Sequence, residues 1–257
     1  MGSTPTLSAK KNKKNDRMAQ IKILGSGSSG NGYIIEEGGQ SLIIELGMPY
    51  EDYIVNTDFS SIVACIVSHR HHDHYREKVA KKFAKMGVNV FANQDVHDAY
   101  TGKDNPIKVL EKGKANFFGD FVVQAIPLSH SVPNFGYLIK HPNFGRLVFA
   151  TDTNEFNYKF KEINHWLIEC NYDPNIVVDT KLSGEDVRSN YGDHLSKQKC
   201  FETLKNNYGA FTKTITLIHL SDSNSNAAAF KQELQDLLNY DKIEVAGLTK
   251  DVQIINL

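Results

Sequence analysis

His69-Arg70-His71-His72-Asp73-His74 comes just after an apolar run, residues 62–67, that predicts a buried strand. Imidazole nitrogens and carboxylate oxygens are ligands of zinc, iron and manganese. The segment therefore predicts metal binding at the point where a strand gives way to a loop. A purification tag can also be rich in histidine, but it would lie at a terminus and would lack the interleaved Asp73.

The spacing within this segment suggests two neighbouring ions. His69, His71 and Asp73 can face one way along an extended backbone, and His74 follows directly. His72 holds an alternate position, so we expect it to point away from the metals, with Arg70 serving only as a spacer.

Three further residues follow apolar runs elsewhere in the chain: His130, Asp152 and His219. Each alone is weak evidence, but together with the first segment they make a set that divides into two groups. The groups are His69, His71 and His130 for one ion, and Asp73, His74 and His219 for a second, with Asp152 bridging. Two such ions activate water and hold an anionic substrate. The histidines at 97, 141 and 165 lack this context, and we interpret them as structural or surface residues.

The whole chain of 257 residues has a formal net charge of −1 and fits one large domain. Residues 1–17 carry five basic side chains against Asp16, a net +4, which leaves −5 for residues 18–257. Residues 1–17 lack apolar periodicity, and we expect a disordered basic leader, tag or nucleic-acid arm preceding a catalytic domain from Met18 to the end. The acidic body argues against a broad footprint on duplex DNA.

A cytoplasmic location and no membrane partner are expected, because neither a secretory signal nor an apolar run long enough to span a bilayer is present. The cysteines, Cys65, Cys170 and Cys200, are odd in number and predict reduced residues instead of a disulfide framework.

The apolar pattern predicts antiparallel strands first and alternating strands and helices later, which favours two packed sheets with helices outside, an α/β architecture. The expected strands are residues 21–24, 33–36, 41–45, 62–67, 88–91, 117–126 as a hairpin, 135–139, 146–150, 165–169, 214–219 and 242–245. The expected helices are residues 75–86, 94–100, 194–208 and 226–238.

The loop of residues 25–30 matches the glycine pattern of dinucleotide-binding proteins. That motif requires a following helix, whereas residues 31–39 predict a strand and a turn. We therefore reject nicotinamide binding. Either the small residues let the backbone pass close to a site, with Ser28, Ser29 and Asn31 as hydrogen-bonding groups, or the loop is simply a tight connection.

These motifs resemble those of the metallo-β-lactamase superfamily, whose His-x-His-x-Asp-His motif corresponds to residues 69–74, with later motifs at His130, Asp152 and His219. The resemblance extends from about Ile21 to the C-terminus. It implies a four-layer αββα sandwich with its site at one edge of the two sheets.

A closer similarity is to the WalJ/YycJ-type branch, carried by residues 24–31, 169–173, 192–196 and 218–221. This branch implies phosphodiester cleavage, including DNA exonuclease activity. The chain departs from it in having Glu45 where Asp is usual, Asp193 inserted before His194, and Tyr172 where His is frequent. The insertion leaves the placement of His194 open.

The ligand set and the resemblance together predict a dinuclear phosphodiesterase that acts on nucleic acid and uses zinc or manganese, with iron or nickel as alternatives. Asp73 is expected to bind metal and hold the nucleophile's proton. His194 either donates a proton to the substrate or only packs at a helix start. Glu45, Asn171 and Ser221 are candidates for orienting the ligands. A homodimer is possible.

The sequence leaves other functions as alternatives. A cyclic-nucleotide or cyclic-phosphate phosphodiesterase, such as phages use against defence signals, suits the acidic body. A β-lactamase normally needs export, and a thioester hydrolase of the glyoxalase II kind would need a basic patch for glutathione. A metal-stabilised binding protein with a vestigial site is disfavoured by the complete ligand set.

Overall fold

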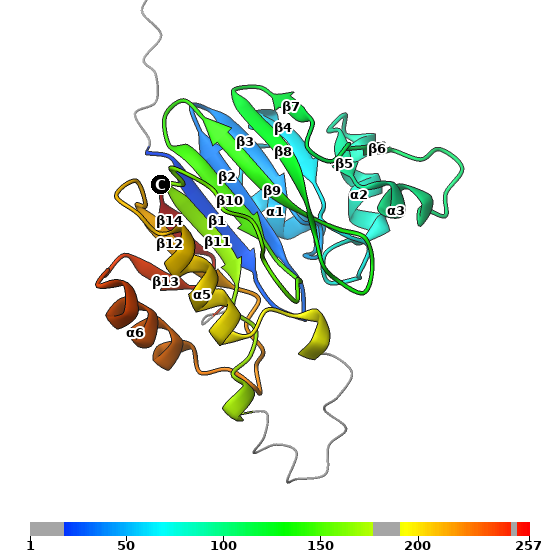
Figure 1. The fold of residues 1–257 in the computed structure, drawn as a ribbon. Coiled ribbons are helices and arrows are strands. Elements are labelled where there is room, and N and C mark those ends of the chain that lie inside the picture. Colours follow the sequence, from blue (N-terminus) through cyan, green and yellow to red (C-terminus); the bar gives the residue numbers. More distant parts are fainter. Residues whose placement is uncertain (1–17, 177–190, 248–250) are drawn as a thin grey trace, which may run out of the picture.

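The computed structural model describes residues 18–176, 191–247 and 251–257, and it has two seven-stranded sheets packed face to face (Figure 1). Helices cover the outer face of each sheet, which confirms the predicted αββα class. The predicted leader, residues 1–17, lies outside the described residues. Within them, no helix is both long enough and apolar enough to cross a bilayer.

The first sheet has the order β14-β1-β2-β3-β4-β5-β6. Its antiparallel half ends at β3, and β3 to β6 run parallel. The strands are β1 (Gln20–Gly25), β2 (Gly32–Glu37), β3 (Gln40–Ile44), β4 (Ile62–Ile66), β5 (Val90–Ala92), β6 (Ile107–Val109) and β14 (Gln253–Asn256).

The second sheet repeats this plan in the order β13-β12-β11-β10-β9-β8-β7, antiparallel from β7 to β10 and parallel from β10 to β13. Its strands are β7 (Ala115–Phe118), β8 (Phe121–Leu128), β9 (Asn134–His141), β10 (Gly145–Ala150), β11 (His165–Glu169), β12 (Thr214–Ile218) and β13 (Ile243–Val245).

Helices α1 (Tyr50–Asn56), α2 (Glu77–Lys85) and α3 (Gln94–Asp98) belong to the half of the chain that forms the first sheet. Helices α5 (Lys197–Asn207) and α6 (Ala227–Leu238) cover the second. Short 3-10 turns lie at Phe59–Ser61 and Tyr191–Asp193. Because both faces of each sheet are covered, the central strands are continuous apolar runs.

Alternation along the strands divides the apolar side chains between two layers. In β2, Ile35 packs into the core between the sheets, while its neighbour Ile34 packs outward toward the helices. The same holds in β10, where Phe149 faces inward and Val148 faces outward.

Several predicted elements differ from those observed. Helix α5 begins at Lys197 and not at residue 194, because Ser196 caps it by accepting a hydrogen bond from the amide of Lys199. Helix α2 begins two residues after the predicted residue 75. The elements α1, β6 and β14 were missed, since each is short and has an exposed side.

The carboxyl ends of β4, β8, β10, β11 and β12 meet at one edge of the sandwich. His69, His130, Asp152 and His219 all follow these strands within three residues. The fold therefore gathers residues from distant parts of the sequence at this edge.

Candidate metal centre

The turn that carries the histidine motif is held by backbone hydrogen bonds to two other loops. The amide of Asn31 donates to the carbonyl of Asp73 (2.7 Å), and the amide of Leu46 donates to that of His74 (2.8 Å). Gly47 passes so close that a Cβ there would lie 1.7 Å from the carbonyl oxygen of Asp73. Only glycine allows this approach, which fixes where the motif points.

All seven residues predicted as ligands lie together, and they form two groups that share Asp152. A third group of possible donors joins Asp152 and His219 to Glu169 and His194. In the first group, His71 Nδ1 lies 3.1 Å from both His69 Nε2 and His130 Nε2. Asp152 Oδ2 lies 3.7 Å from His69 Nε2 and 3.8 Å from His130 Nε2.

The second group uses the other oxygen of the same carboxylate. Asp152 Oδ1 lies 3.3 Å from His74 Nε2 and 3.6 Å from His219 Nδ1. Asp73 Oδ2 lies 3.1 Å from His74 Nε2 and 3.4 Å from His219 Nε2. Each oxygen of Asp152 therefore faces a separate group.

These spacings fit divalent ions. Metal–ligand bonds of about 2.1 Å in a tetrahedral site place neighbouring donors roughly 3.4 Å apart, and the distances above scatter around that value. Burial opposes ionisation of Asp152, but the imidazoles of His219, His74 and His69 outweigh burial and hold the pKa of its carboxyl well below the usual value. A buried, ionised carboxylate among imidazoles is a donor set suited to divalent cations.

The second ring nitrogen of two of the imidazoles has a polar partner that orients the ring. His69 Nδ1 lies 2.9 Å from Ser68 Oγ, and His130 Nδ1 lies 3.0 Å from the carbonyl oxygen of Asp193. Such partners fix the ring tautomer and leave the opposite nitrogen for a metal.

One of the three residues predicted to orient ligands, Asn171, has this kind of contact, and Glu45 lies beside an imidazole without a hydrogen bond. Glu45 Oε1 lies 3.6 Å from His74 Nδ1, and both atoms are buried without a hydrogen-bond partner. Asn171 Nδ2 lies 3.2 Å from His219 Nδ1 and donates to the His219 carbonyl (2.8 Å). Ser221 is further removed, because its hydroxyl accepts from Asn224 and its amide donates to the Asn171 carbonyl.

The backbone is strained at this edge. Glu45, Asp152 and His219 all have positive φ angles, of 63°, 52° and 53°. This region costs a side-chain-bearing residue about 1–2 kcal/mol. Left-handed backbone at three residues of one cluster is typical of a functional site.

Glu169, at the end of β11, was not predicted as a site residue. Its side chain is fully buried, and Oε1 lies 2.7 Å from His194 Nδ1 and 3.3 Å from His219 Nδ1. Oε2 accepts from the amides of Thr153 (2.9 Å) and Leu195 (3.1 Å). The sequence did carry a signal, since Glu169 ends an apolar run as Asp152 nearly does.

His194 lies beside the cluster and not away from it. Its ring centroid is 5.3 Å from that of His219 and 5.7 Å from that of His130. Burial opposes protonation of His194, but the hydrogen bond and charge of Glu169 outweigh it and raise the pKa of the imidazole. With Nδ1 engaged by Glu169, Nε2 is the nitrogen available to a substrate.

The glycine-rich loop contacts the cluster. Asn31 Nδ2 reaches Asp73 Oδ2 (3.3 Å) and His74 Nε2 (3.0 Å). Ser26, which sequence reasoning missed, accepts the amide of His219 through Oγ (2.9 Å). Ser28 and Ser29 are exposed instead.

The remaining residues of the motif and the other histidines have structural contacts. His72 is exposed, and Arg70 pairs with Asp95 at 2.9 Å. His165 is buried between Thr214 Oγ1 and the carbonyl of Phe144, and His97 contacts the carbonyl of Ile107.

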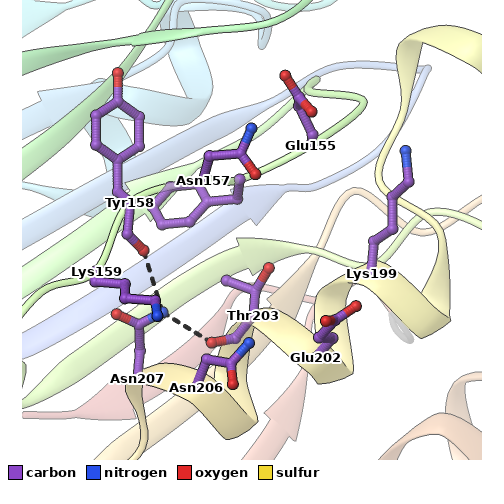
Figure 2. Close-up of a pocket in the computed structure, with 10 residues that line it drawn as sticks. Glu155, Asn157, Tyr158, Lys159, Lys199, Glu202, Thr203, Asn206 and Asn207 are labelled. Carbon is purple, nitrogen blue, oxygen red and sulfur yellow. Dashed lines mark hydrogen bonds between the residues drawn. The ribbon is translucent and has the colours of Figure 1, made fainter.

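A cavity of about 270 Å³ lies between residues 155–159 and helix α5, and none of the residues that line it is a candidate ligand (Figure 2). Asn207 joins its two walls by donating to the carbonyls of Tyr158 (3.2 Å) and Thr203 (2.9 Å). Lys199 donates to the carbonyl of Asn154, two residues beyond Asp152. The lining holds two lysines and two glutamates, so the cavity has no net charge.

The family model for the beta-lactamase superfamily domain matches residues 51–185, which is more than half of the chain. The chain belongs to the metallo-β-lactamase superfamily and is a hydrolase of that fold.

Among curated proteins, it is 29% identical over 227 residues to the exodeoxyribonuclease WalJ of Streptococcus pneumoniae, covering 80% of this chain and 83% of WalJ. The metallo-beta-lactamase fold protein YhfI from Bacillus subtilis is 15% identical with a TM-score of 0.71, covering 93% of this chain and all of that one. Human tRNase Z, short form, is 13% identical with a TM-score of 0.61, covering 92% and 98%.

Proposed function

We propose that this protein is a metal-dependent phosphodiesterase that cleaves nucleic acid. The observation that carries the proposal is the pair of donor groups on opposite oxygens of Asp152, with His194 beside them. The similarity to an exodeoxyribonuclease over four-fifths of the chain supports the same substrate class.

In this proposal the two groups each hold one divalent ion. His69, His71 and His130 would hold the first, Asp73, His74 and His219 would hold the second, and Asp152 would contribute to both. Bound ions of this kind supply Lewis acidity that activates water and offsets the negative charge of a phosphodiester. Zinc or manganese suits the mixed imidazole and carboxylate set, and iron and nickel are the alternatives.

The chain's own residues supply orientation and proton transfer. Asp73 Oδ2 lies within the second group and can accept a proton from the attacking water as well as bind metal. Nε2 of His194 can donate to a phosphate oxygen or protonate the leaving oxygen. Glu169 holds the His194 ring in place and stabilises its charged form.

Hydrolysis of bis-p-nitrophenyl phosphate by metal-loaded protein tests the reaction class. We expect turnover of this diester and no turnover of nitrocefin or lactoylglutathione. Activity on the latter two alone would mean a β-lactamase or thioesterase.

Substrate choice requires a second panel of single strand, duplex and cyclic nucleotides. We expect cleavage of nucleic-acid strands. Turnover confined to cyclic nucleotides would favour the small-substrate phosphodiesterase instead.

A further inference from the structure

One face of helix α2 carries a concentrated positive charge. Four lysines, at 78, 81, 82 and 85, are exposed, and at 3.6 residues per turn they share an arc of about 100°. The buried residues Val79, Ala80 and Phe83 occupy the opposite side. The lysines are therefore not needed to pack the helix.

The charge is local to this segment. Residues 76–85 contain five basic side chains and one acidic one, a net +4. Since residues 18–257 carry −5, everything else in that range carries −9. Solvated helix faces usually mix both signs, because like charges at i and i+4 destabilise a helix. Here Lys78 and Lys82, and Lys81 and Lys85, are such like-charged pairs.

Most of these lysines are not neutralised by neighbours. Lys82 pairs with Glu51 at 2.6 Å, but Lys78, Lys81 and Lys85 form no ion pair with another described residue. The Glu77 carboxylate is occupied by the amide and hydroxyl of Thr101.

A hollow of about 780 Å³ adjoins this face, between the last turns of α2 and residues 100–106. Lys81, Lys85 and Lys103 line it with Tyr100 and a single acid, Asp104. It thus has an excess of positive charge and an aromatic ring, whereas the cavity of Figure 2 is balanced. Lysine with an aromatic ring suits a phosphate backbone with unstacked bases.

The start of this face is close to the histidine motif in the sequence. Helix α2 starts three residues after His74, and Arg76 Nη2 donates to the carbonyl of Ser29 in the glycine-rich loop (3.1 Å). From Lys78 to Lys85 the helix rises about 10 Å, the length of roughly three phosphates along one strand of a duplex. A strand held along the face would extend past the first turn of α2, which follows the histidine motif.

We propose that Lys78, Lys81, Lys85 and Lys103, the α2 basic strip, bind the phosphate backbone of a nucleic-acid substrate and guide it to the metal centre. This inference rests on the proposed function and makes its substrate polymeric. The narrow strip also accounts for how an acidic body can hold a polyanion.

The test compares the triple variant Lys78→Gln/Lys81→Gln/Lys85→Gln with a matched control, Lys112→Gln/Lys161→Gln/Lys205→Gln. Both remove the same charge from exposed positions, and glutamine has nearly the helix propensity of lysine. Binding of labelled 20-nucleotide single-stranded DNA, RNA and duplex is measured between 50 and 200 mM salt, roughly the range over which phosphate contacts dominate affinity. Thermal melts check folding.

We expect the strip variant to lose about tenfold or more in affinity and its log–log salt slope to fall by about 2, since each phosphate contact on single strands contributes about 0.7. The ratio of oligonucleotide cleavage to bis-p-nitrophenyl phosphate cleavage should fall with it. The control should bind as the parent does.

Equal losses of affinity in both variants, or no loss in either, would refute the proposal that the α2 basic strip binds nucleic acid. Binding needs no turnover, so a protein that binds strands through the strip but hydrolyses no diester would refute the proposed function alone. Diester hydrolysis without oligonucleotide binding would refute the strip alone.

Discussion

Glu169 Oε1 lies 2.7 Å from Nδ1 of His194, and the same carboxylate accepts two backbone amides through its other oxygen. A carboxylate can accept on both sides, whereas an amide has only one accepting oxygen. The pair therefore depends on Glu169 having two accepting oxygens.

Glu169→Gln is predicted to lower kcat by about 10- to 100-fold, the usual loss for a residue that orients a functional group. The side-chain NH₂ of the introduced glutamine must face either His194 or the amides of Thr153 and Leu195. We also expect roughly 1–3 kcal/mol of lost stability from the unpaired groups. Steady-state kinetics and urea unfolding measure the two effects. A stable variant with full kcat would show that Glu169 is only a packing residue.

His194→Ala is predicted to slow cleavage of a dinucleotide by about 10²- to 10⁴-fold, because a sugar alkoxide needs a proton as it leaves. The loss on bis-p-nitrophenyl phosphate should be much smaller, since p-nitrophenolate leaves unprotonated. His72→Ala, which removes an exposed histidine of the same motif, is the control. Equal losses on both substrates would exclude a proton donor.

The division of ligands predicts metal content. We expect the parent protein to hold two ions per chain, and His71→Ala and His219→Ala to hold about one each, because each residue belongs to a different group. Asp152→Ala should lose both, since its two oxygens face the two groups. Elemental analysis of protein purified without added metal gives the counts. Complete loss in His71→Ala would contradict separate sites.

The sequence located the strand ends well because its apolar runs stop abruptly at His or Asp. The signal for Glu169 was weak, since an acid that ends a strand is usually solvated, whereas the fold buries this one and brings the amides of Thr153 and Leu195 to it. Ser26 was missed for a similar reason: it is adjacent to His219 only in space, 193 residues away in the chain. Ordinary polar residues reveal such roles only when the fold is known.

The edge elements were also beyond sequence reasoning. β14 pairs with β1 across nearly the whole chain and is half exposed, so its short apolar run gives little signal. The start of α5 was misplaced because His194 lies in the loop that ends at the Ser196 cap. For β14 a tertiary contact outweighs the local pattern, whereas the Ser196 cap of α5 is a local interaction.

Gly47→Ala is predicted to disturb the metal centre from outside it. A Cβ there would lie 1.7 Å from the carbonyl of Asp73, so the histidine turn must move. Overpacking of this kind costs about 1–3 kcal/mol, and we expect weaker metal retention as well. Gly209→Ala, which meets nothing within 4 Å, is the control. Unfolding curves and metal content measure the two effects. A variant as stable and as metal-rich as the control would contradict the claim that only glycine fits beside the Asp73 carbonyl.

His165 predicts a pH dependence of stability unconnected with the metal ligands. Burial lowers the pKa of its imidazole to about 4, against 6.5 for an exposed histidine. Between these two pKa values the imidazole of His165 is protonated in the unfolded chain and neutral in the folded chain. Stability from this group is therefore complete above about pH 6.5 and is lost as pH falls toward 4, by up to about 3 kcal/mol.

His165→Gln removes the titration while keeping a polar side chain between Thr214 and the Phe144 carbonyl. We expect the variant to be less stable than the parent at pH 7.5, with a shallower fall in unfolding free energy between pH 6.5 and 4. The difference between the two curves isolates His165, because every other titrating group is common to both. Parallel curves would mean that His165 is protonated as readily in the folded protein as in the unfolded chain.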